Sequence, residues 1–264
     1  MILKFFKKII FIVSKINVYL KYQKKIKEAI KWILFGKEIT NFTYGLKNIN
    51  ELIHAANSIT NLDYEKIKEI VDEIKIDNEE FRLFFTDRFF EEFTDTKFFG
   101  RRILWYIIAR AMKPETIIES GVFQGLGSSL LVYALYKNSQ EVNFTNNNFY
   151  GVDIKLNNLY FKNPNKEKMN IEFIEKDSLE FLRNFNHTQK ILFISDAKHE
   201  YNFEIKEFNL IKKNMKTGSI IISDSGSKSL SDFSVLNKKK LVCFTEEVDK
   251  HWHPGSKCLV SYNY

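Results

Sequence analysis

Three glycines between an apolar run and a helical run constrain this chain more than any other feature. Residues 116–120 have the pattern of a buried strand that ends in an acid and a serine, and Gly121, Gly125 and Gly127 follow within seven residues. Glycine has no Cβ, so the backbone of such a turn can approach a ligand closely. The helical run that follows presents unpaired N–H groups in its first turn. The segment predicts a strand–turn–helix unit that binds a nucleotide-like small molecule, with an ordinary Gly-rich turn as the alternative.

From residue 116 onward, short apolar runs alternate with helical ones. Predicted strands lie at 116–120, 148–153, 171–175, 190–196 and 219–223, and predicted helices lie at 128–136, 178–185 and 203–214. Such alternation is typical of a parallel sheet covered by helices on both faces. Two further β-like runs, 240–246 and 257–262, predict a terminal antiparallel hairpin. We therefore expect an α/β, Rossmann-like, doubly wound fold with a mostly parallel, seven-stranded sheet.

The first 95 residues show no strand alternation and predict a helical extension. Helical runs lie at 48–57, 63–75 and 78–85, and another at 97–112 leads into the sheet. Asp63 is placed to cap the second of these helices. The aromatic run 81–90 is more typical of a core than of a pocket wall. We divide the chain into an N-terminal helical extension, 1–95, and a Rossmann-like domain, 96–264.

The positive charge of the chain is concentrated at its N-terminus. The formal net charge is +7, and the first 40 residues carry ten Lys against two Glu, so the remainder is close to neutral. This distribution argues against a uniformly basic nucleic-acid-binding surface. Cys243 and Cys258 have neither metal-binding nor redox spacing, which favours free thiols in a reducing compartment. We therefore expect a cytoplasmic protein with no nucleic-acid partner.

Residues 1–20 predict a basic amphipathic helix. Its apolar side chains are spaced at three or four residues and share one face: Phe5, Ile9, Ile12, Ile16 and Leu20. The apolar run is too short for a signal peptide or for a spanning helix of about 20 residues. Two interpretations of residues 1–40 stay open. They attach to a partner or to an anionic membrane surface, such as the inner face of the membrane, or they pack on their own domain or on a second subunit of a homo-oligomer.

Acids collect after the predicted strands, where the carboxyl ends of parallel strands form one edge. The five are Glu119, Asp153, Asp177, Asp196 and Asp224. Each alone has the alternative role of a helix N-cap. A carboxylate at Asp153 is also placed to accept hydrogen bonds from both hydroxyls of a ribose.

These motifs resemble the class I S-adenosylmethionine-dependent methyltransferases. The resemblance covers residues 101–264 and is greatest to small-molecule O-methyltransferases of the caffeoyl-CoA, macrocin and cephalosporin-biosynthesis type. The motifs that carry it are ESGVFQG at 119–125, GVDI at 151–154, EKDS at 175–178, ISDAKH at 194–199 and SIIISD at 219–224. The resemblance implies S-adenosylmethionine as cofactor and S-adenosylhomocysteine as product.

The same resemblance implies roles for individual residues. Glu119 with the loop from Gly121 to Gly127 would hold the methionine end of the cofactor, Asp153 the ribose, and Asp177 with Ser178 the adenine. The full set implied for cofactor binding is Glu119, Gly121, Gln124, Gly125, Ser128, Asp153, Ile154, Asp177 and Ser178.

Acids after the fourth and fifth strands imply a catalytic centre. In related enzymes they hold a divalent cation, so Asp196 and Asp224 are candidate Mg²⁺ ligands. Lys198 departs from that pattern, because its ammonium would repel a cation or replace it beside a substrate oxyanion. His199 is the first candidate for general base, with Asp196 as the alternative base or as the group that orients it. A structural histidine is the other interpretation.

We expect O-methylation of a sugar or related small-molecule acceptor, in bacterial surface polysaccharide or natural-product biosynthesis, because related enzymes with such extensions modify sugars. One alternative is a non-catalytic, methyltransferase-like interaction subunit. Another is an NAD-type oxidoreductase, but GxGxxG is missing and Asp153 follows Gly121 by 32 residues instead of about 20. His251 and His253 have no third metal ligand nearby and predict a solvent-facing turn beside the substrate pocket.

Overall fold

The computed structural model describes residues 2–14, 26–36, 44–141, 147–163, 169–249, 251, 253 and 255–263. Its strands are β1 (Gly45–Leu46), β2 (Thr116–Ser120), β3 (Asn148–Asp153), β4 (Asn170–Glu175), β5 (Ile191–Ser195), β6 (Ile220–Ser223), β7 (Lys240–Thr245), β8 (Val248–Asp249) and β9 (Lys257–Tyr262). Its helices are α1 (Ile2–Ser14), α3 (Ile26–Phe35), α4 (Ile49–Thr60), α5 (Tyr64–Glu73), α6 (Glu79–Arg82), α7 (Asp87–Glu92), η2 (Thr96–Phe99), α8 (Arg102–Met112), α9 (Leu126–Ser139), α10 (Ser178–Asn184), α11 (Tyr201–Lys212) and α12 (Lys228–Leu236).

The central sheet has seven strands in the order β4-β3-β2-β5-β6-β9-β7. From β4 to β6 all neighbours are parallel, while β9 runs antiparallel to both β6 and β7. β7 and β9 therefore form the predicted terminal antiparallel pair, and β9 lies between β6 and β7. This arrangement confirms the Rossmann-like, mostly parallel fold predicted from the alternation of strands and helices.

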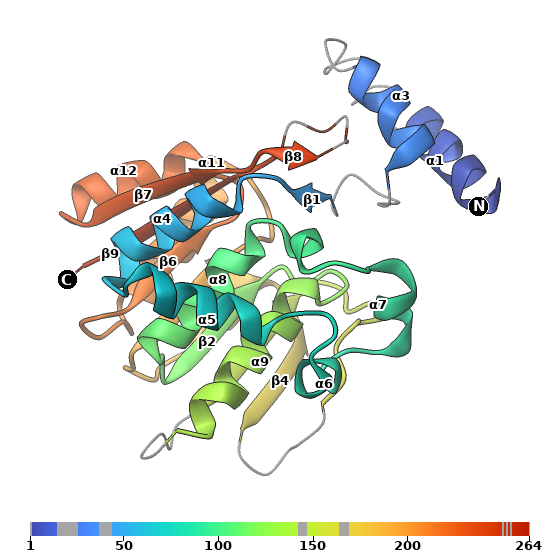
Figure 1. The fold of residues 1–264 in the computed structure, drawn as a ribbon. Helices are drawn as coiled ribbons and strands as arrows, with labels where there is room; N and C mark the ends of the chain where they lie inside the picture. Colours follow the sequence, from blue (N-terminus) through green and yellow to red (C-terminus); the bar gives the residue numbers. More distant parts are fainter. Residues whose placement is uncertain are drawn as a thin grey trace.

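Alternate side chains of the strands enter two separate cores. Ile117 of β2 joins a core with α4, α5, α8 and α9, whereas its neighbour Ile118 joins a core with α10, α11 and α12. Ile220 and Ile221 of β6 divide in the same way. Because successive strand residues point to opposite faces, the sheet is buried on both sides and the fold has three layers (Figure 1).

Residues 44–99 contribute to the same core as the sheet. Leu52, Ile70 and Phe89 lie in one buried cluster with Trp105 and Leu131. The aromatic run is core, as predicted: Phe81, Phe84, Phe85 and Phe89 are buried. The Asp63 side chain accepts a hydrogen bond of 2.7 Å from the backbone N–H of Lys66, which confirms the predicted cap. The division at residue 95 stays a prediction about domains.

Helices α1 and α3 lie beside one another and project away from the layered body (Figure 1). The predicted amphipathic helix is present over Ile2–Ser14, while Ile16 and Leu20 lie outside the described residues. Among the described helices, none combines the length and apolarity needed to cross a membrane.

Several short elements were not predicted. β1 and β8 are two residues each and pair only with one another, so they leave no alternation to detect. Helix α12 was also missed, because serines occupy part of its buried face and hide the apolar periodicity. Ser229 and Ser234 are buried there beside Leu230 and Phe233.

Leu131→Ala tests the core between α9 and the sheet. Leu131 is fully buried, and its truncation leaves a cavity that we expect to lower the free energy of unfolding by about 2–5 kcal/mol. Leu236→Ala is the matched control, because Leu236 is 81% exposed and its loss should change stability by less than about 0.5 kcal/mol. Urea denaturation measures both, and equal effects would contradict this assignment of the core.

Candidate active site

A cavity of about 1130 Å³ opens at the carboxyl ends of the parallel strands. Its wall contains nine residues predicted for the site: Gly121, Asp153, Ile154, Asp177, Ser178, Asp196, Lys198, His199 and Asp224. Four other predicted residues are not part of the wall: Glu119, Gln124, Gly125 and Ser128. The strand ends are the edge at which open α/β sheets bind ligands.

The glycine loop folds tightly against the ends of β2 and β5. Gly121 has φ +88°, and a Cβ there would overlap the backbone carbonyl of Asp196. A Cβ at Gly127 would lie 2.5 Å from Glu119 Oε1 and equally close to the Trp105 ring. These glycines therefore allow close packing of strand, loop and helix. Gly125 packs against the Leu159 side chain instead of facing the cavity.

Asp153 connects the end of β3 to the glycine loop. Its Oδ2 accepts hydrogen bonds from the backbone N–H groups of Val122 (2.8 Å) and Phe123 (2.9 Å), and its Oδ1 accepts one from Lys155 (3.1 Å). The side chains of Phe123 and Ile154 flank it and are exposed. A carboxylate between two exposed apolar side chains presents both polar and apolar contacts to a ligand.

Glu119 lies behind the cavity. It is buried at the end of β2 and accepts a hydrogen bond from the Ser128 hydroxyl at the start of α9. Burial raises the pKa of Glu119 to about 8, against an ordinary value of 4.5. Neither Glu119 nor Ser128 lines the cavity, and their hydrogen bond instead holds α9 against β2.

Asp177 and Ser178 line the cavity and also begin α10. The Asp177 side chain caps the helix by accepting a hydrogen bond from the Glu180 N–H at 3.0 Å. The Ser178 hydroxyl donates to Glu207 of α11, which also accepts from Ser120 and Ser195 at the ends of β2 and β5. Asp177 therefore both caps α10 and forms part of the cavity wall.

Arg101 forms a buried ion-pair network beside the cavity. Its guanidinium donates to both carboxylate oxygens of Asp224, through Nε at 2.6 Å and through Nη2, and its Nη1 donates to Glu246 at 3.0 Å. The Tyr44 hydroxyl donates to the same Glu246 carboxylate. Burial alone would raise the pKa of Asp224, but Arg101 lowers it below the usual range.

The predicted metal ligands do not form a metal site as the structure arranges them. Arg101 binds both oxygens of Asp224, and Arg102 Nη2 lies 3.9 Å from Asp196 Oδ2. No cluster of three or more His, Cys, Asp or Glu side chains suitable for a metal occurs among the described residues. Two guanidiniums beside two carboxylates do not fit a divalent cation, which prefers six or more oxygen ligands.

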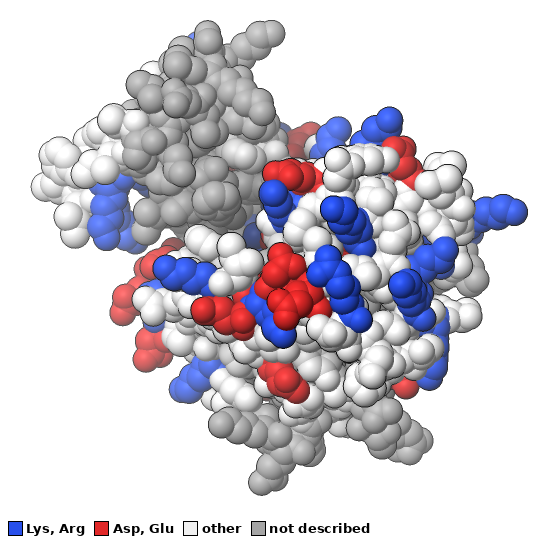
Figure 2. Space-filling view, turned by 180° about the vertical axis from the view of Figure 1, so that it is seen from behind, with Lys and Arg blue, Asp and Glu red and all other residues white. Residues whose placement is uncertain are grey.

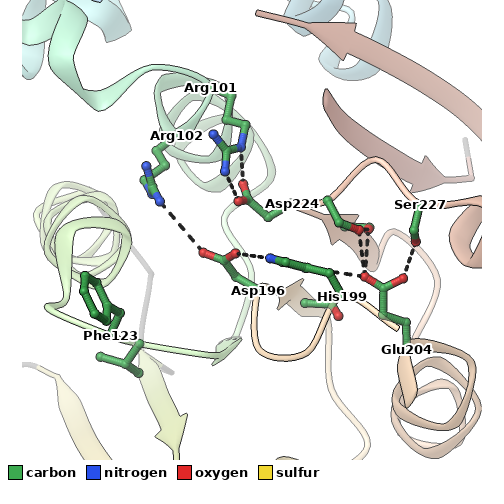
Figure 3. Close-up of polar contacts among 12 residues, drawn as sticks. Arg101, Arg102, Phe123, Asp196, His199, Glu204, Asp224 and Ser227 are labelled. Carbon is green, nitrogen blue, oxygen red and sulfur yellow. Dashed lines mark hydrogen bonds and ion pairs between the residues drawn. The ribbon is translucent and has the colours of Figure 1, made fainter. Parts of the chain in front are cut away.

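His199 lies between two carboxylates (Figure 3). Its Nε2 is 3.5 Å from Asp196 Oδ1, and its Nδ1 is 3.9 Å from Oε1 of Glu204, a buried residue of α11. Burial would raise the pKa of Glu204, but His199 and the nearby serine hydroxyls lower it. Glu204 is therefore held as a carboxylate behind the imidazole.

Glu204 was not predicted from the sequence. Four alternate serines surround its carboxylate: Ser223, Ser225, Ser227 and Ser229. This repeat of serines at the end of β6 is the sequence signal from which a buried hydrogen-bond acceptor could have been inferred. Lys198 lines the cavity, but its ammonium pairs with Glu200 at 3.0 Å.

The outer wall of the cavity comes from the two ends of the chain. Tyr44 precedes β1, and His253 and Ser256 precede β9; all three line the cavity. The rings of Tyr44 and His253 stack with centroids 5.5 Å apart. His251 is buried and its ring packs against the Trp32 ring of α3, with ring centroids 4.9 Å apart. The prediction of a solvent-facing histidine turn is wrong for His251, because α3 covers it.

Comparison with known proteins gives one family match. Residues 118–225 match the family model described as a methyltransferase domain. This segment begins within β2, extends beyond β6 and contains most of the residues of the cavity wall. A search of curated proteins by sequence gives no match.

Solved structures give weak likenesses. MycE, a methyltransferase of the mycinamycin pathway in complex with Mg and SAH, has 18% identity and a TM-score of 0.31, over 43% of this chain and 28% of MycE. TomG of Streptomyces achromogenes, in complex with SAM, has 10% identity and a TM-score of 0.43, over 75% and 95%. SAH-bound PaMTH1 of Podospora anserina has 10% identity and a TM-score of 0.41, over 84% of this chain and 90% of PaMTH1. At TM-scores below 0.5 these likenesses carry no argument about activity or substrate.

Glu119→Gln tests the buried carboxyl through the pH dependence of stability. Its pKa is about 8 in the fold and 4.5 is its ordinary value, so between these pH values the folded chain holds the additional proton and stability falls as pH rises. The amide cannot titrate and still accepts from Ser128. We expect the stability of the variant relative to wild type to rise between pH 5 and 8, by up to about 1.4 kcal/mol per pH unit.

Urea denaturation at pH 5.5, 7 and 8.5 measures this difference. Glu65→Gln, at an exposed position of α5, is the control and should show no such trend. A stability difference for Glu119→Gln that does not change with pH would contradict a protonated Glu119.

Proposed function

We propose that this chain, whose residues 118–225 match the family model of a methyltransferase domain, is a class I S-adenosylmethionine-dependent enzyme that O-methylates a sugar or related small-molecule acceptor. The observation that carries the proposal is the cavity at the strand ends. It joins Asp153 and the glycine loop on one side to His199 and a polar outer wall on the other. Surface polysaccharide or natural-product biosynthesis is the setting that we propose for it.

The cavity residues fit this cofactor. When bound, S-adenosylmethionine supplies an electrophilic methyl group on its sulfonium. Asp153 would bind the ribose hydroxyls, and the exposed Phe123 and Ile154 would pack against the adenosine. Asp177 and Ser178 belong to the same wall and would contact the adenine. Glu119, Gln124, Gly125 and Ser128 act from behind, by fixing the shape of the loop.

Asp153 has the lone pairs to serve both the loop and a ribose. A carboxylate offers about four acceptor sites, and the backbone N–H groups of residues 122, 123 and 155 use three of them. One ribose hydroxyl would donate to the free site, and the second would replace the N–H of Lys155, whose bond of 3.1 Å is the longest of the three. The glycine loop remains held by the two shorter bonds.

The acceptor half of the cavity suits a hydroxylated molecule. Tyr44, His253 and Ser256 present aromatic and hydrogen-bonding groups to the cavity that His199 also lines. Sugars combine apolar ring faces with hydroxyl groups, so stacking on an aromatic face and hydrogen bonds at the rim are the contacts that they need. Such positioning is the main requirement for in-line methyl transfer.

His199 is the proposed general base. A hydroxyl acceptor must lose its proton, and an imidazole is suited to accept it near neutral pH. Glu204 behind Nδ1 stabilises the imidazolium that results, and Asp196 on the other side orients the ring. Glu204 is a positioning residue, because His199 separates it from the acceptor. Lys198 is one of the cations of the cavity wall, and its ammonium pairs with Glu200.

The cellular setting is part of the proposal. We place the protein in the cytoplasm, because Cys243 and Cys258 are free thiols in the structure and reducing compartments keep thiols free. We also propose that the protein has no nucleic-acid partner, which agrees with the near-neutral charge of residues 41–264. The same charge is compatible with a homo-oligomer.

Calorimetric titration with S-adenosylmethionine tests the cofactor site. We expect wild type to bind it and Asp153→Ala to bind at least tenfold more weakly, because each hydrogen bond to a carboxylate contributes about 1.5–3 kcal/mol. Asp72→Ala, at a surface position of α5, is the control and should bind like wild type. Binding of NAD in place of S-adenosylmethionine would instead support the oxidoreductase alternative.

His199→Ala tests the general base. In an assay of S-adenosylhomocysteine release over a panel of methyl glycosides and nucleotide-linked sugars, we expect turnover to fall about 10²–10⁴-fold with cofactor affinity unchanged. Glu204→Gln should cause a smaller loss. Cofactor binding by wild type without turnover of any acceptor would contradict the catalytic proposal and favour a non-catalytic subunit.

A further inference from the structure

Helix α1 carries an exposed apolar stripe on the side that does not pack. Its members are exposed by 55–72%: Ile2, Leu3, Phe6, Ile10 and Val13. At about 100° per residue they fall within one third of the helix circumference. The facing side is used for packing, because Lys8 is buried there and donates to the backbone carbonyl of Trp32 at 2.9 Å and to that of Gly36. The stripe is therefore additional to the contact with α3.

Helix α3 extends the same apolar surface. Ile30, Leu34 and Phe35 are exposed by 52–70%. A mostly apolar groove of about 860 Å³ is lined by the two helices and by Glu92 and Thr94, and its apolar side chains include Ile2, Phe6, Ile33 and Leu34. Stripe and groove share side chains, so they form one surface. We call this combined area the α1–α3 surface.

The charge of the two helices is mostly positive, and the acid on the groove wall, Glu92, comes from α7. Lys4, Lys7, Lys27 and Lys31 are exposed on the two helices. The sequence of α1 contains no acid and that of α3 contains one, Glu28. The layered body differs, because Lys and Arg are interspersed with Asp and Glu over it (Figure 2).

This combination selects among possible occupants of the surface. A second copy of the chain would bring the same lysines face to face, which opposes self-association. An anionic lipid surface offers both requirements at once, since acyl chains accept the apolar stripe and headgroups pair with the lysines. Helix α1 is about 20 Å long at 1.5 Å per residue, shorter than the hydrocarbon core of about 30 Å. It would lie in the plane of the interface.

We infer that the α1–α3 surface docks the protein on an anionic lipid membrane. The inserted residues are Ile2, Leu3, Phe6, Ile10 and Val13, and the lysines of both helices pair with the headgroups. The docked helices remain connected to the cavity, because Trp32 contacts His251 and His251 contacts Tyr44 of the cavity wall, with ring centroids 5.6 Å apart. The inference is independent of the methyl acceptor.

Vesicle sedimentation with the full chain tests the inference. We expect wild type to bind phosphatidylcholine vesicles that contain 30% phosphatidylglycerol at least tenfold better than pure phosphatidylcholine vesicles. Phe6→Ser with Ile10→Ser should lower binding to the anionic vesicles at least tenfold. Val235→Ser with Leu236→Ser is the matched control, because these side chains of α12 are 75% and 81% exposed. That control should bind like wild type.

Charge-reversal variants measure the electrostatic contribution to vesicle binding. Lys4→Glu with Lys7→Glu should lower binding at least tenfold and weaken its dependence on salt, whereas Lys66→Glu with Lys68→Glu on α5 should not. The substituted side chains are exposed, so circular dichroism should be unchanged. Equal binding of wild type and Phe6→Ser/Ile10→Ser would overturn the inference. So would a wild-type dimer that this variant abolishes in sedimentation equilibrium, because a second copy would then cover the surface.

Discussion

The buried guanidinium of Arg101 determines how the ends of this chain meet the sheet. It joins the start of α8 to Asp224 after β6 and to Glu246 after β7, and Tyr44 completes the network. An ion pair taken out of water gains little net stability, but removal of one partner leaves a buried charge that costs about 3–5 kcal/mol. The network therefore fixes geometry more than it adds stability. It holds the outer wall of the cavity, which contains Tyr44, against the strand ends that carry the proposed chemistry.

A second set of buried acids holds the strand ends themselves. Glu207 accepts hydrogen bonds from serines at the ends of β2 and β5 and at the start of α10. Glu204, one turn earlier on α11, accepts them from the serines after β6 and lies behind His199. One helix thus connects three strand ends on one side of the cavity. The proposed base is consequently supported by the same helix that sets the spacing of these strands.

The framework of the fold could be predicted from the sequence, because parallel strands buried on both faces are continuous apolar runs. The bounds predicted for β2 and β3 are those observed. The pocket edge followed from the acids after these strands. Arg101, Tyr44 and Glu246 could not be identified, since their role depends on contacts between residues more than 50 positions apart. Likewise the glycines predicted a ligand loop, yet Gly127 serves the packing of α9 on Trp105.

The contact between Trp32 and His251 has a thermodynamic consequence. His251 also contacts Tyr44 of the cavity wall, so the His251 side chain lies between the helical pair and the cavity. Binding equilibria that share a protein are reciprocal. Any factor by which occupancy of the α1–α3 surface raises the affinity for the acceptor is also the factor by which bound acceptor raises the affinity of that surface for its own ligand. An acceptor concentrated at that same surface would thereby retain the protein where further acceptor is available.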